Sequence, residues 1–284
     1  MHKESIHTIL EQFSKTISHL SSVEKENITR DFKLLLSFIE SGEYKNTELL
    51  HRNRFDTQKR TYEFFSYIQG YNRQAMDWFE FLQNIPLKEI TSILDIGPGF
   101  SPKLALALKR ANYEGLLTLL DKSEIALNGL KQFLEMMGVS FDIRFLCDDF
   151  FNGAHCSYQL VAANHLFDDL IIDAYCSSKQ MPTKQIYEDE TVFIKTTEDI
   201  MLEFDKTRFL MSISSVFSKT VAKDGYLLFR NYKGLTEQAL ELSNWHEYVS
   251  NFFEDVILLL QKEGMTILER KNGFVLLKNL INRN

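Results

Sequence analysis

Apolar residues in the first 88 positions recur at intervals of three and four, which is the spacing of one face of an α-helix. The clearest run begins at Ile6 and continues to Leu20, and two others lie within 32–39 and 62–81. No segment of this part alternates apolar and polar positions as a half-buried strand does. We therefore expect residues 1–88 to form an all-helical N-terminal cap region.

The pattern changes after Pro86 to short apolar runs that alternate with helical stretches. The runs predict strands at 92–96, 116–120, 141–146, 160–163, 226–229, 265–269 and 274–277. The helical stretches lie at 102–111, at 123–137, from about 166, through 209–217 and at 245–262. Strands that alternate with helices favour right-handed crossovers, and hence a parallel sheet with helices on both faces.

Two turns and one insertion complete this scheme. Asn272 and Gly273 separate the last two runs, and Asn-Gly between apolar runs is a strong signal for an antiparallel hairpin. Another turn is expected at 223–225, before the fifth strand. Residues 175–203 form an insertion after the fourth strand that we expect to act as a lid. The pattern thus predicts an α/β domain at 89–284, with a mostly parallel seven-stranded sheet that ends in an antiparallel hairpin.

The charge balance of the chain is acidic, with 32 Lys and Arg residues against 39 Asp and Glu residues. Proteins that hold nucleic acid usually carry a basic surplus, because contacts to phosphate supply most of the affinity. Nucleic acid is therefore not the expected partner. The basic residues between Lys45 and Arg73 are interpreted as a solvated helix face. The alternative is that Arg52, Arg54 or Arg60 meets a carboxylate or phosphate of a ligand.

The cysteines and the apolar runs bear on the cellular compartment. Cys147, Cys156 and Cys176 are odd in number and lack C-x-x-C spacing, which favours reduced thiols over disulfides or a zinc site. No metal site is therefore expected. The polar N-terminus lacks the apolar core of a secretory signal, and no stretch is long enough to span a bilayer. We expect a cytoplasmic protein with no membrane partner, and a homo-oligomer is compatible with the sequence.

A glycine turn, Asp-Ile-Gly-Pro-Gly at 95–99, follows the first predicted strand. Glycine lets a backbone turn sharply and approach a ligand closely. The helix that follows offers free N–H groups and the positive end of its dipole. A dinucleotide fingerprint would require a third glycine at position 102, where this chain has proline, so the turn argues against NAD and NADP.

Acidic residues follow the next two predicted strands. Asp121 ends the second strand beside Lys122, and Asp148 and Asp149 end the third, just before Phe150. A carboxylate has two oxygens and can accept hydrogen bonds from both hydroxyls of a ribose. The alternative for Asp121 is a helix cap or an exposed acid.

The glycine turn and the acids after it, in this order, resemble motif I and the later landmarks of the class I S-adenosylmethionine-dependent methyltransferases. Ser101 stands where that motif usually has its third glycine, and the resemblance covers about 90–278. It implies a Rossmann-like fold, S-adenosylmethionine as cofactor, ribose binding by Asp121 and adenine binding by Asp149, with Asp148 as the alternative. The cofactor-binding residues that it implies are Asp95, Gly97, Pro98, Gly99, Asp121, Lys122, Asp148, Asp149, Phe150 and Asn164.

The segment after the fourth strand begins with Asn164 and His165. In the family this segment passes under the methyl donor and meets the acceptor, so Asn164 is expected near the methionyl portion. His165 is the candidate catalytic base, because histidine titrates near neutral pH, and Asp168 is the candidate to orient it. The alternatives are that His165 fills a polar niche and that Asp168 is a first-turn acid favoured by the helix dipole.

Two acceptor types are disfavoured by the same segment. Residues 164–169 lack the Asn-Pro-Pro-Tyr sequence used on exocyclic amines of nucleobases, and no carboxylates cluster after the fifth strand for a magnesium-assisted site. The sequence thus favours transfer of a methyl group to an N or O acceptor on a small molecule. The alternatives are a protein, peptide or RNA acceptor, a catalytically silent methyltransferase-like binding subunit, and transfer of the aminobutyryl arm of the same cofactor.

Overall fold

The computed structural model describes residues 72–99, 101–153, 157–234, 237 and 240–280, together with the single positions 22 and 26. The helices and the basic stretch predicted before residue 72 therefore lie outside the described residues. The helical prediction is confirmed for the described end of that region, where α5 spans Asn72–Leu82 and the short 3-10 helix η4 spans Leu87–Glu89. The boundary placed between residues 88 and 89 stays a prediction.

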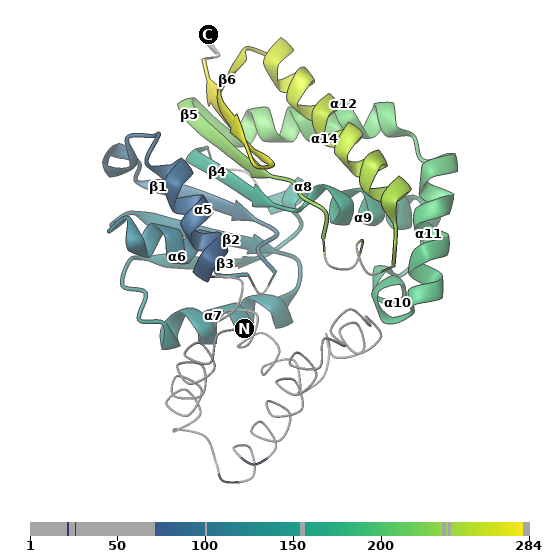
Figure 1. The fold of residues 1–284 in the computed structure, drawn as a ribbon, viewed down its shortest axis with the longest axis horizontal. Coiled ribbons are helices and arrows are strands. Elements are labelled where there is room, and N and C mark those ends of the chain that lie inside the picture. Colours follow the sequence, from purple (N-terminus) through teal and green to yellow (C-terminus); the bar gives the residue numbers. More distant parts are fainter. Residues whose placement is uncertain are drawn as a thin grey trace.

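Seven strands form one sheet in the order β3-β2-β1-β4-β5-β7-β6 (Figure 1). Their bounds are β1 Ser92–Ile96, β2 Leu116–Asp121, β3 Ile143–Cys147, β4 Tyr158–Asn164, β5 Val221–Arg230, β6 Met265–Lys271 and β7 Phe274–Asn279. Strands β1 to β5 pair in parallel, whereas β7 runs antiparallel to both β5 and β6. The predicted mostly parallel seven-stranded sheet with a C-terminal antiparallel hairpin is confirmed.

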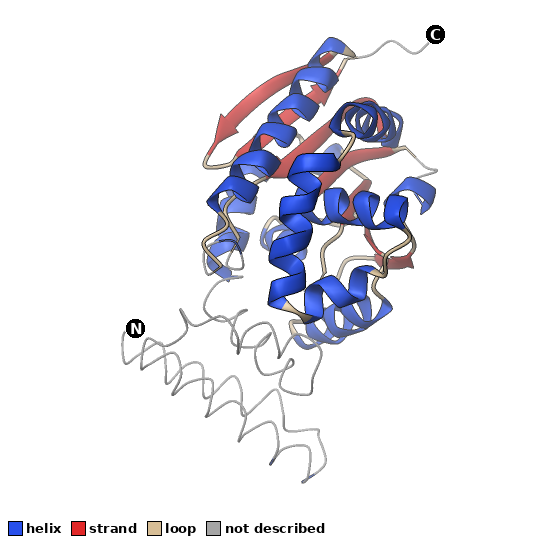
Figure 2. Ribbon diagram, turned by 90° about the vertical axis from the view of Figure 1, so that its right-hand side faces the viewer, coloured by secondary structure: helices blue, strands red, loops and turns tan. Residues whose placement is uncertain are grey.

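Helices cover both faces of this sheet (Figures 1 and 2). Besides α5, they are α6 Lys103–Arg110, α7 Glu124–Met136, α8 Phe150–Gly153, α9 Phe167–Lys179, α10 Thr183–Glu188, α11 Glu190–Glu203, α12 Lys206–Thr220 and α14 Ser243–Lys262. No helix of the described ranges is long and apolar enough to cross a membrane. Of the three cysteines, Cys147 and Cys176 are free thiols, and Cys156 lies outside the described residues.

The sheet separates two hydrophobic cores, because successive side chains of a strand point to opposite faces. Ile93 of β1 packs with α5, α6 and α7, where Trp78 is fully buried. Its neighbour Leu94 packs with α9, α12 and α14, around Phe167 and Phe217. Burial on both faces explains why the central strands are continuous apolar runs in the sequence.

The hairpin signal near the C-terminus is confirmed in detail. Asn272 and Gly273 have φ values of 53° and 78°, and two successive residues with positive φ are what a type I′ turn requires. A Cβ atom at position 273 would overlap the carbonyl oxygen of Asn231. Glycine is therefore needed here both for its conformation and for the close approach of the segment that follows β5.

Two predicted boundaries differ from the structure. The turn expected at 223–225 lies inside β5, as an irregularity where Asp224 has a φ of 60° and the pairing with β4 shifts register. The strand resumes beyond it, so a local turn signal does not end the strand. The insertion expected at 175–203 begins within α9 and continues through α10 and α11, because apolar spacing carries α9 past residue 175. Its role as a lid stays a prediction.

Candidate functional site

The carboxyl ends of the parallel strands meet where the strand order reverses, between β1 and β4. Chain connections leave β1 toward β2 on one side and return to β4 on the other, which opens a crevice at this point of an α/β sheet. The glycine turn follows β1, and Asp121 and Asn164 are the last residues of β2 and β4. The fold thus brings the predicted site residues to one edge.

The glycine turn has the conformation that its sequence predicts. Gly97 and Gly99 have φ values of 60° and 56°, a region that side chains rarely adopt. The Gly97 N–H donates to the carbonyl oxygen of Leu120 at 2.8 Å, and a Cβ at position 97 would overlap the side chain of Leu166. At Gly99 a Cβ would meet no atom of the described residues within 4 Å. Gly97 is therefore constrained by packing, whereas Gly99 borders open space.

Asp121 is bonded to the glycine turn. Its Oδ2 accepts the Gly99 N–H at 2.9 Å, and its Oδ1 accepts the Ser123 N–H at 2.8 Å. An ionised carboxylate offers about four lone-pair sites, so each oxygen keeps acceptor capacity after these bonds. Burial raises the pKa of Asp121, while the two backbone N–H groups oppose that rise.

The acids after β3 are also held by backbone groups. Asp149 accepts the Phe151 N–H at 2.8 Å at the start of α8, and Asp148 accepts the Asp149 N–H at 2.7 Å. The Phe150 side chain is buried and packs at 5.0 Å from the Phe217 ring. Asp148 is exposed and Asp149 is half-buried. The choice between them as the adenine-binding acid stays a prediction.

Lys122, the residue after β2, interacts with α9. Its ammonium forms an ion pair with Asp173 on α9, and burial raises the pKa of Asp173 while Lys122 opposes that rise. The acid one turn earlier on the same helix, Asp169, accepts a hydrogen bond from Tyr187 of α10. The insertion is thus bonded to α9 beside the ends of β2 and β3.

Asp95 lies within β1, one residue before its end, and is only 5 % exposed. Burial raises the pKa of Asp95 to about 8, nearby Asp121 adds to the rise, and Lys103 opposes it. Lys103, the first residue of α6, is also 5 % exposed. Burial is the main cause that lowers the pKa of Lys103. Two buried titratable groups, one acidic and one basic, therefore lie near the glycine turn.

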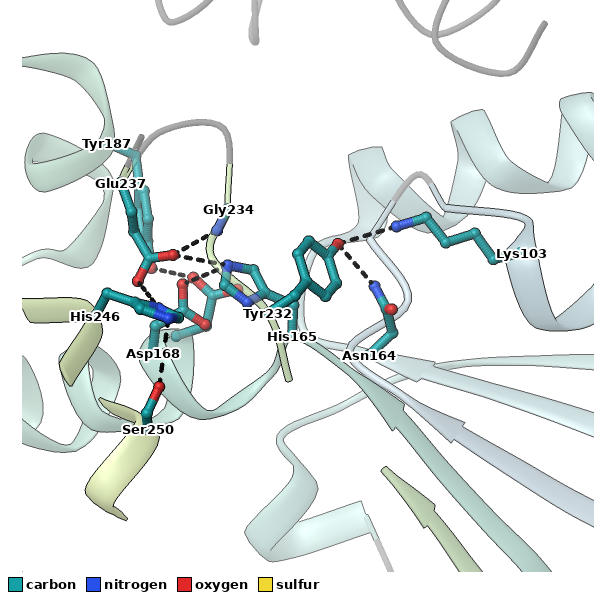
Figure 3. Close-up of polar contacts among 11 residues, drawn as sticks. Lys103, Asn164, His165, Asp168, Tyr187, Tyr232, Gly234, Glu237, His246 and Ser250 are labelled. Atoms are coloured by element: carbon teal, nitrogen blue, oxygen red, sulfur yellow. Dashed lines mark hydrogen bonds and ion pairs between the residues drawn. The ribbon is translucent and has the colours of Figure 1, made fainter. Parts of the chain in front are cut away.

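Tyr232, in the segment after β5, forms hydrogen bonds with Lys103 of α6 and with Asn164 at the end of β4 (Figure 3). Its hydroxyl oxygen accepts from Lys103 Nζ at 3.1 Å and from Asn164 Nδ2 at 3.3 Å. The other polar atom of that amide, Asn164 Oδ1, is buried and has no hydrogen-bond partner among the described residues. Lys103, Asn164 and Tyr232 thus converge from three separate segments of the chain.

His165 packs against a face of the Tyr232 ring. The two rings stack with centroids 4.7 Å apart and an interplanar angle of 23°. His165 has a φ of 52°, and its N–H donates to the Arg230 carbonyl oxygen at 2.8 Å. Its Nε2 lies 3.3 Å from Asp168 Oδ2, while its Nδ1 is buried and forms no hydrogen bond within the described part of the chain. The structure therefore brings the predicted base and the predicted orienting acid together.

A second acid and a second histidine extend this group. Glu237 is only 2 % exposed, accepts the Gly234 N–H and lies 3.9 Å from His165 Nε2. Its Oε1 lies 3.5 Å from His246 Nδ1, and His246 Nε2 lies 3.5 Å from the hydroxyl of Ser250 on α14. Burial raises the pKa of Asp168, with His165 opposing the rise and Glu237 adding to it.

Sequence reasoning missed four members of this site: Lys103, Tyr232, Glu237 and His246. Only Lys103 has a local signal, since it is a charged residue at the start of the apolar helix sequence Lys-Leu-Ala-Leu-Ala-Leu. The other three follow β5, where no motif marks them. Within the described ranges, no group of three or more His, Cys, Asp and Glu side chains is arranged to hold a metal ion.

Comparisons with known proteins give matches among solved structures. No protein-family model matches the sequence, and a search of curated proteins finds no match either. Magnesium protoporphyrin IX methyltransferase from Synechocystis, solved with S-adenosylhomocysteine, is 13 % identical with a TM-score of 0.47, over 88 % of this chain and 99 % of that one.

Two further solved structures show similarities of the same order. An O-methyltransferase family 2 protein from Planctomyces limnophilus, in complex with apigenin, is 11 % identical with a TM-score of 0.46, over 76 % of this chain and 61 % of that one. The ribosomal protein L11 methylase of Lactobacillus delbrueckii subsp. bulgaricus is 13 % identical with a TM-score of 0.39, over 73 % of this chain and 77 % of that one.

Proposed function

We propose that this chain binds S-adenosylmethionine and transfers its methyl group to an N or O acceptor on a small molecule. The observation that carries the proposal is the Asp121 carboxylate, which is fixed at the end of β2 by the N–H groups of Gly99 and Ser123. An acid held in this way beside a glycine turn can accept from the two hydroxyls of a ribose, since each oxygen keeps a lone pair.

The residues around Asp121 fit the remaining parts of that cofactor. The open space next to Gly99 admits a ligand against the backbone. Asp95 and Asn164 Oδ1 are buried acceptors near the turn, and a buried acceptor without a donor favours a cationic or hydrogen-bonding ligand group. In this proposal Asp149 or Asp148 and the backbone of Phe150 hold the adenine, and Pro98 and Lys122 border the site.

S-adenosylmethionine supplies a methyl group already activated on a sulfonium sulfur. The chain then has to align the acceptor with that methyl group, exclude water and receive the acceptor's proton. We assign the proton to His165 at Nδ1, which no described residue bonds, while Asp168 at 3.3 Å from Nε2 orients the ring. A histidine whose second nitrogen faces a carboxylate has its tautomer fixed in this way.

The cofactor assignment is tested by calorimetric titration of S-adenosylmethionine and S-adenosylhomocysteine into wild type and Asp121→Ala. Loss of two charge-assisted hydrogen bonds, each worth about 1.5–3 kcal/mol, predicts a fall in affinity of about 100-fold or more. Asp142→Ala is the matched control, because Asp142 is exposed and precedes β3 at its opposite end. Absence of binding to a well-folded wild type would refute the proposal.

Testing the role of His165 requires a substitution that fits the positive φ of this residue. Asparagine adopts positive φ more readily than alanine does, so His165→Asn removes the imidazole with less strain at a φ of 52°. Turnover is followed with labelled methyl donor against a panel of small N and O acceptors. A drop of about 100-fold is expected for a lost general base, and full turnover in both His165→Asn and His165→Ala would exclude that role.

A further inference from the structure

Lys103 is a buried cation that the cofactor assignment above does not use. Lys103 is the first residue of α6, the helix that follows the glycine turn. It is only 5 % exposed. Burying an ammonium is unfavourable unless specific partners hold it, and here Nζ donates to the Tyr232 hydroxyl at 3.1 Å. Its place in the fold fixes the ammonium beside the turn (Figure 3).

Tyr232 presents a fixed hydrogen-bond donor at the same place. Its hydroxyl oxygen accepts from Lys103 and from Asn164, which uses both of its lone pairs. The hydroxyl hydrogen remains, and no residue in the described part of the chain accepts it. The ring cannot turn easily, since it stacks on His165 on one side and the Arg230 guanidinium lies 5.2 Å from its centroid.

Acceptors lie close to these donors. Asp95 is only 5 % exposed, and no hydrogen bond from the described ranges reaches its carboxylate. Asp95 and Lys103 lie near enough for each charge to act on the pKa of the other. The buried Asn164 Oδ1 also lacks a partner. Donors and acceptors thus occupy adjacent positions, as the two charged ends of an α-amino acid require.

We propose that Lys103 and the Tyr232 hydroxyl bind the α-carboxylate of the cofactor's amino-acid arm, while Asp95 and Asn164 Oδ1 face its α-ammonium. A carboxylate accepts from an ammonium and from a hydroxyl, and charge-assisted bonds of this kind are the strong ones. This inference rests on the proposed function, because it names the residues that recognise one part of the same ligand. It makes Lys103 and Tyr232 determinants of cofactor specificity.

The test compares ligands that differ only in this arm. S-adenosylhomocysteine carries the complete arm, 5′-methylthioadenosine lacks it, and decarboxylated S-adenosylmethionine lacks only the carboxylate. Each is titrated calorimetrically into full-length wild type, Lys103→Met and Tyr232→Phe. Tyr226→Phe is the matched control, since Tyr226 lies on β5 and, as Lys103 does over Tyr232, a lysine, Lys278, lies 5.6 Å from its ring centroid.

We expect Lys103→Met to weaken S-adenosylhomocysteine about 10- to 100-fold and Tyr232→Phe to weaken it about 10-fold, as for hydrogen bonds to a charged group. Both variants should bind methylthioadenosine within about threefold of wild type. Wild type should prefer S-adenosylmethionine to its decarboxylated form, and Lys103→Met should lose that preference. Tyr226→Phe should behave as wild type.

Other outcomes overturn the inference. Equal weakening of S-adenosylhomocysteine and methylthioadenosine would mean that the variants damage the whole pocket, and unchanged affinities would place the carboxylate elsewhere. Lys103→Arg, which keeps the cation, should retain the preference for the carboxylated ligand and guards against misfolding of the methionine variant. If wild type binds neither adenosine compound, the proposed function itself fails, whereas binding of both with no effect of the variants refutes only this inference.

Discussion

The crevice has two halves that are built by different kinds of hydrogen bond. After β1, β2 and β3, carboxylates are held by backbone N–H groups, as Asp121 is by Gly99 and Asp149 is by Phe151. After β4 and β5, side chains bind side chains, as Tyr232 does with Lys103 and Asn164. We call these the β1–β3 half and the β4–β5 half.

The two halves also differ in how completely their polar groups are paired. In the β4–β5 half, five buried polar atoms form no hydrogen bond with a described residue, and they are Asn164 Oδ1, His165 Nδ1, Asp168 Oδ1, Glu237 Oε1 and His246 Nδ1. Buried groups in native proteins are nearly always bonded to protein, water or ligand. The comparison indicates that the backbone fixes the acids after β2 and β3, whereas the β4–β5 half depends on what it binds.

The glycine turn should give the largest effect and tests whether the β1–β3 half is as rigid as this comparison implies. Gly97→Val places a branched side chain at a φ of 60° and against Leu166. Strain of about 1–3 kcal/mol at such a residue, together with the overlap, predicts a loss of about 3 kcal/mol or more in the free energy of unfolding. Urea denaturation measures it.

Gly99→Val is the matched variant. Its φ is similar, but a Cβ at position 99 meets no atom within 4 Å, so only the strain of about 1–3 kcal/mol should remain. We expect the folded Gly99→Val protein to lose affinity for S-adenosylhomocysteine because its side chain fills the open space. Equal destabilisation by both variants, with cofactor binding intact in Gly99→Val, would show that position 99 does not border the ligand.

Asp95 departs from the other acids of its half, because its carboxylate has no backbone donor among the described residues. Burial raises the pKa of Asp95 to about 8, so the folded protein holds a proton that the unfolded chain releases near pH 4. The contribution of this proton to the free energy of unfolding is fully present below the pKa of the unfolded chain and is lost as the pH rises through about 8. The loss between pH 6 and pH 9 should be about 2–3 kcal/mol at most.

Asp95→Asn should remove that part of the pH dependence. The free energy of unfolding, measured by urea denaturation at several pH values between 6 and 9, should fall less steeply in Asp95→Asn than in wild type. Asp142→Asn at an exposed position provides the control and should keep the wild-type slope. Parallel slopes for Asp95→Asn and wild type would mean that Asp95 is ionised throughout and belongs with the backbone-held acids.

How far the sequence predicts each half follows from the distances along the chain. Asp121 and Asp149 each accept from a backbone N–H two positions further along the chain. The second bond of Asp121 joins the ends of two neighbouring strands, β1 and β2. The Tyr232 hydroxyl, in contrast, accepts from residues 68 and 129 positions away. Such contacts depend on the register of β4 against β5, which apolar patterning does not specify beyond the type of element.

His165 illustrates the same limit within one residue. Its place at the end of β4 and its proximity to Asp168 follow from the sequence, because three positions span one turn at the start of a helix. Its stacking on Tyr232 and its closeness to Glu237 do not. The predicted strands and helices thus locate the site, while the direction in which its side chains point is set by the segment after β5.

Glu237→Gln tests whether the β4–β5 half depends on its side-chain network. Glu237 lies between the Gly234 N–H, His165 and His246, and an amide of the same shape keeps one acceptor while removing the charge. We expect a loss of about 2 kcal/mol in the free energy of unfolding, as for a buried hydrogen bond to a charged group.

Glu241→Gln is the control, since Glu241 is exposed close to the same segment, and it should stay within about 0.5 kcal/mol of wild type. A Glu237→Gln protein as stable as wild type would show that the network does not fix the segment after β5. Tyr232 would then be held by its hydrogen bonds to Lys103 and Asn164 and by its ring contacts, without help from Glu237.

The smallest effect concerns the insertion, which meets both halves through α9. Tyr187 on α10 donates to Asp169, and Lys122 after β2 pairs with Asp173 one turn further along α9. Burial and then Asp169 raise the pKa of Tyr187 well above its ordinary value, so the phenol stays a donor at neutral pH. Tyr187→Phe should cost about 1 kcal/mol, with Tyr158→Phe as a control whose hydroxyl has no partner among the described residues.

Hydrogen exchange in α10 should respond to Tyr187→Phe more clearly than the free energy of unfolding does. The hydrogen bond from Tyr187 to Asp169 joins α10 to α9, so its loss in Tyr187→Phe should let α10 open more often. Amide hydrogen exchange within 183–188 should then quicken about fivefold for a change of about 1 kcal/mol in local opening. Exchange in β1 and β4 should not change, because those strands lie in the core on both faces. Unchanged exchange in α10 would mean that its apolar contacts, such as buried Ile186, hold the insertion closed without the hydroxyl, and the insertion would then be a fixed wall of the crevice shared by both halves.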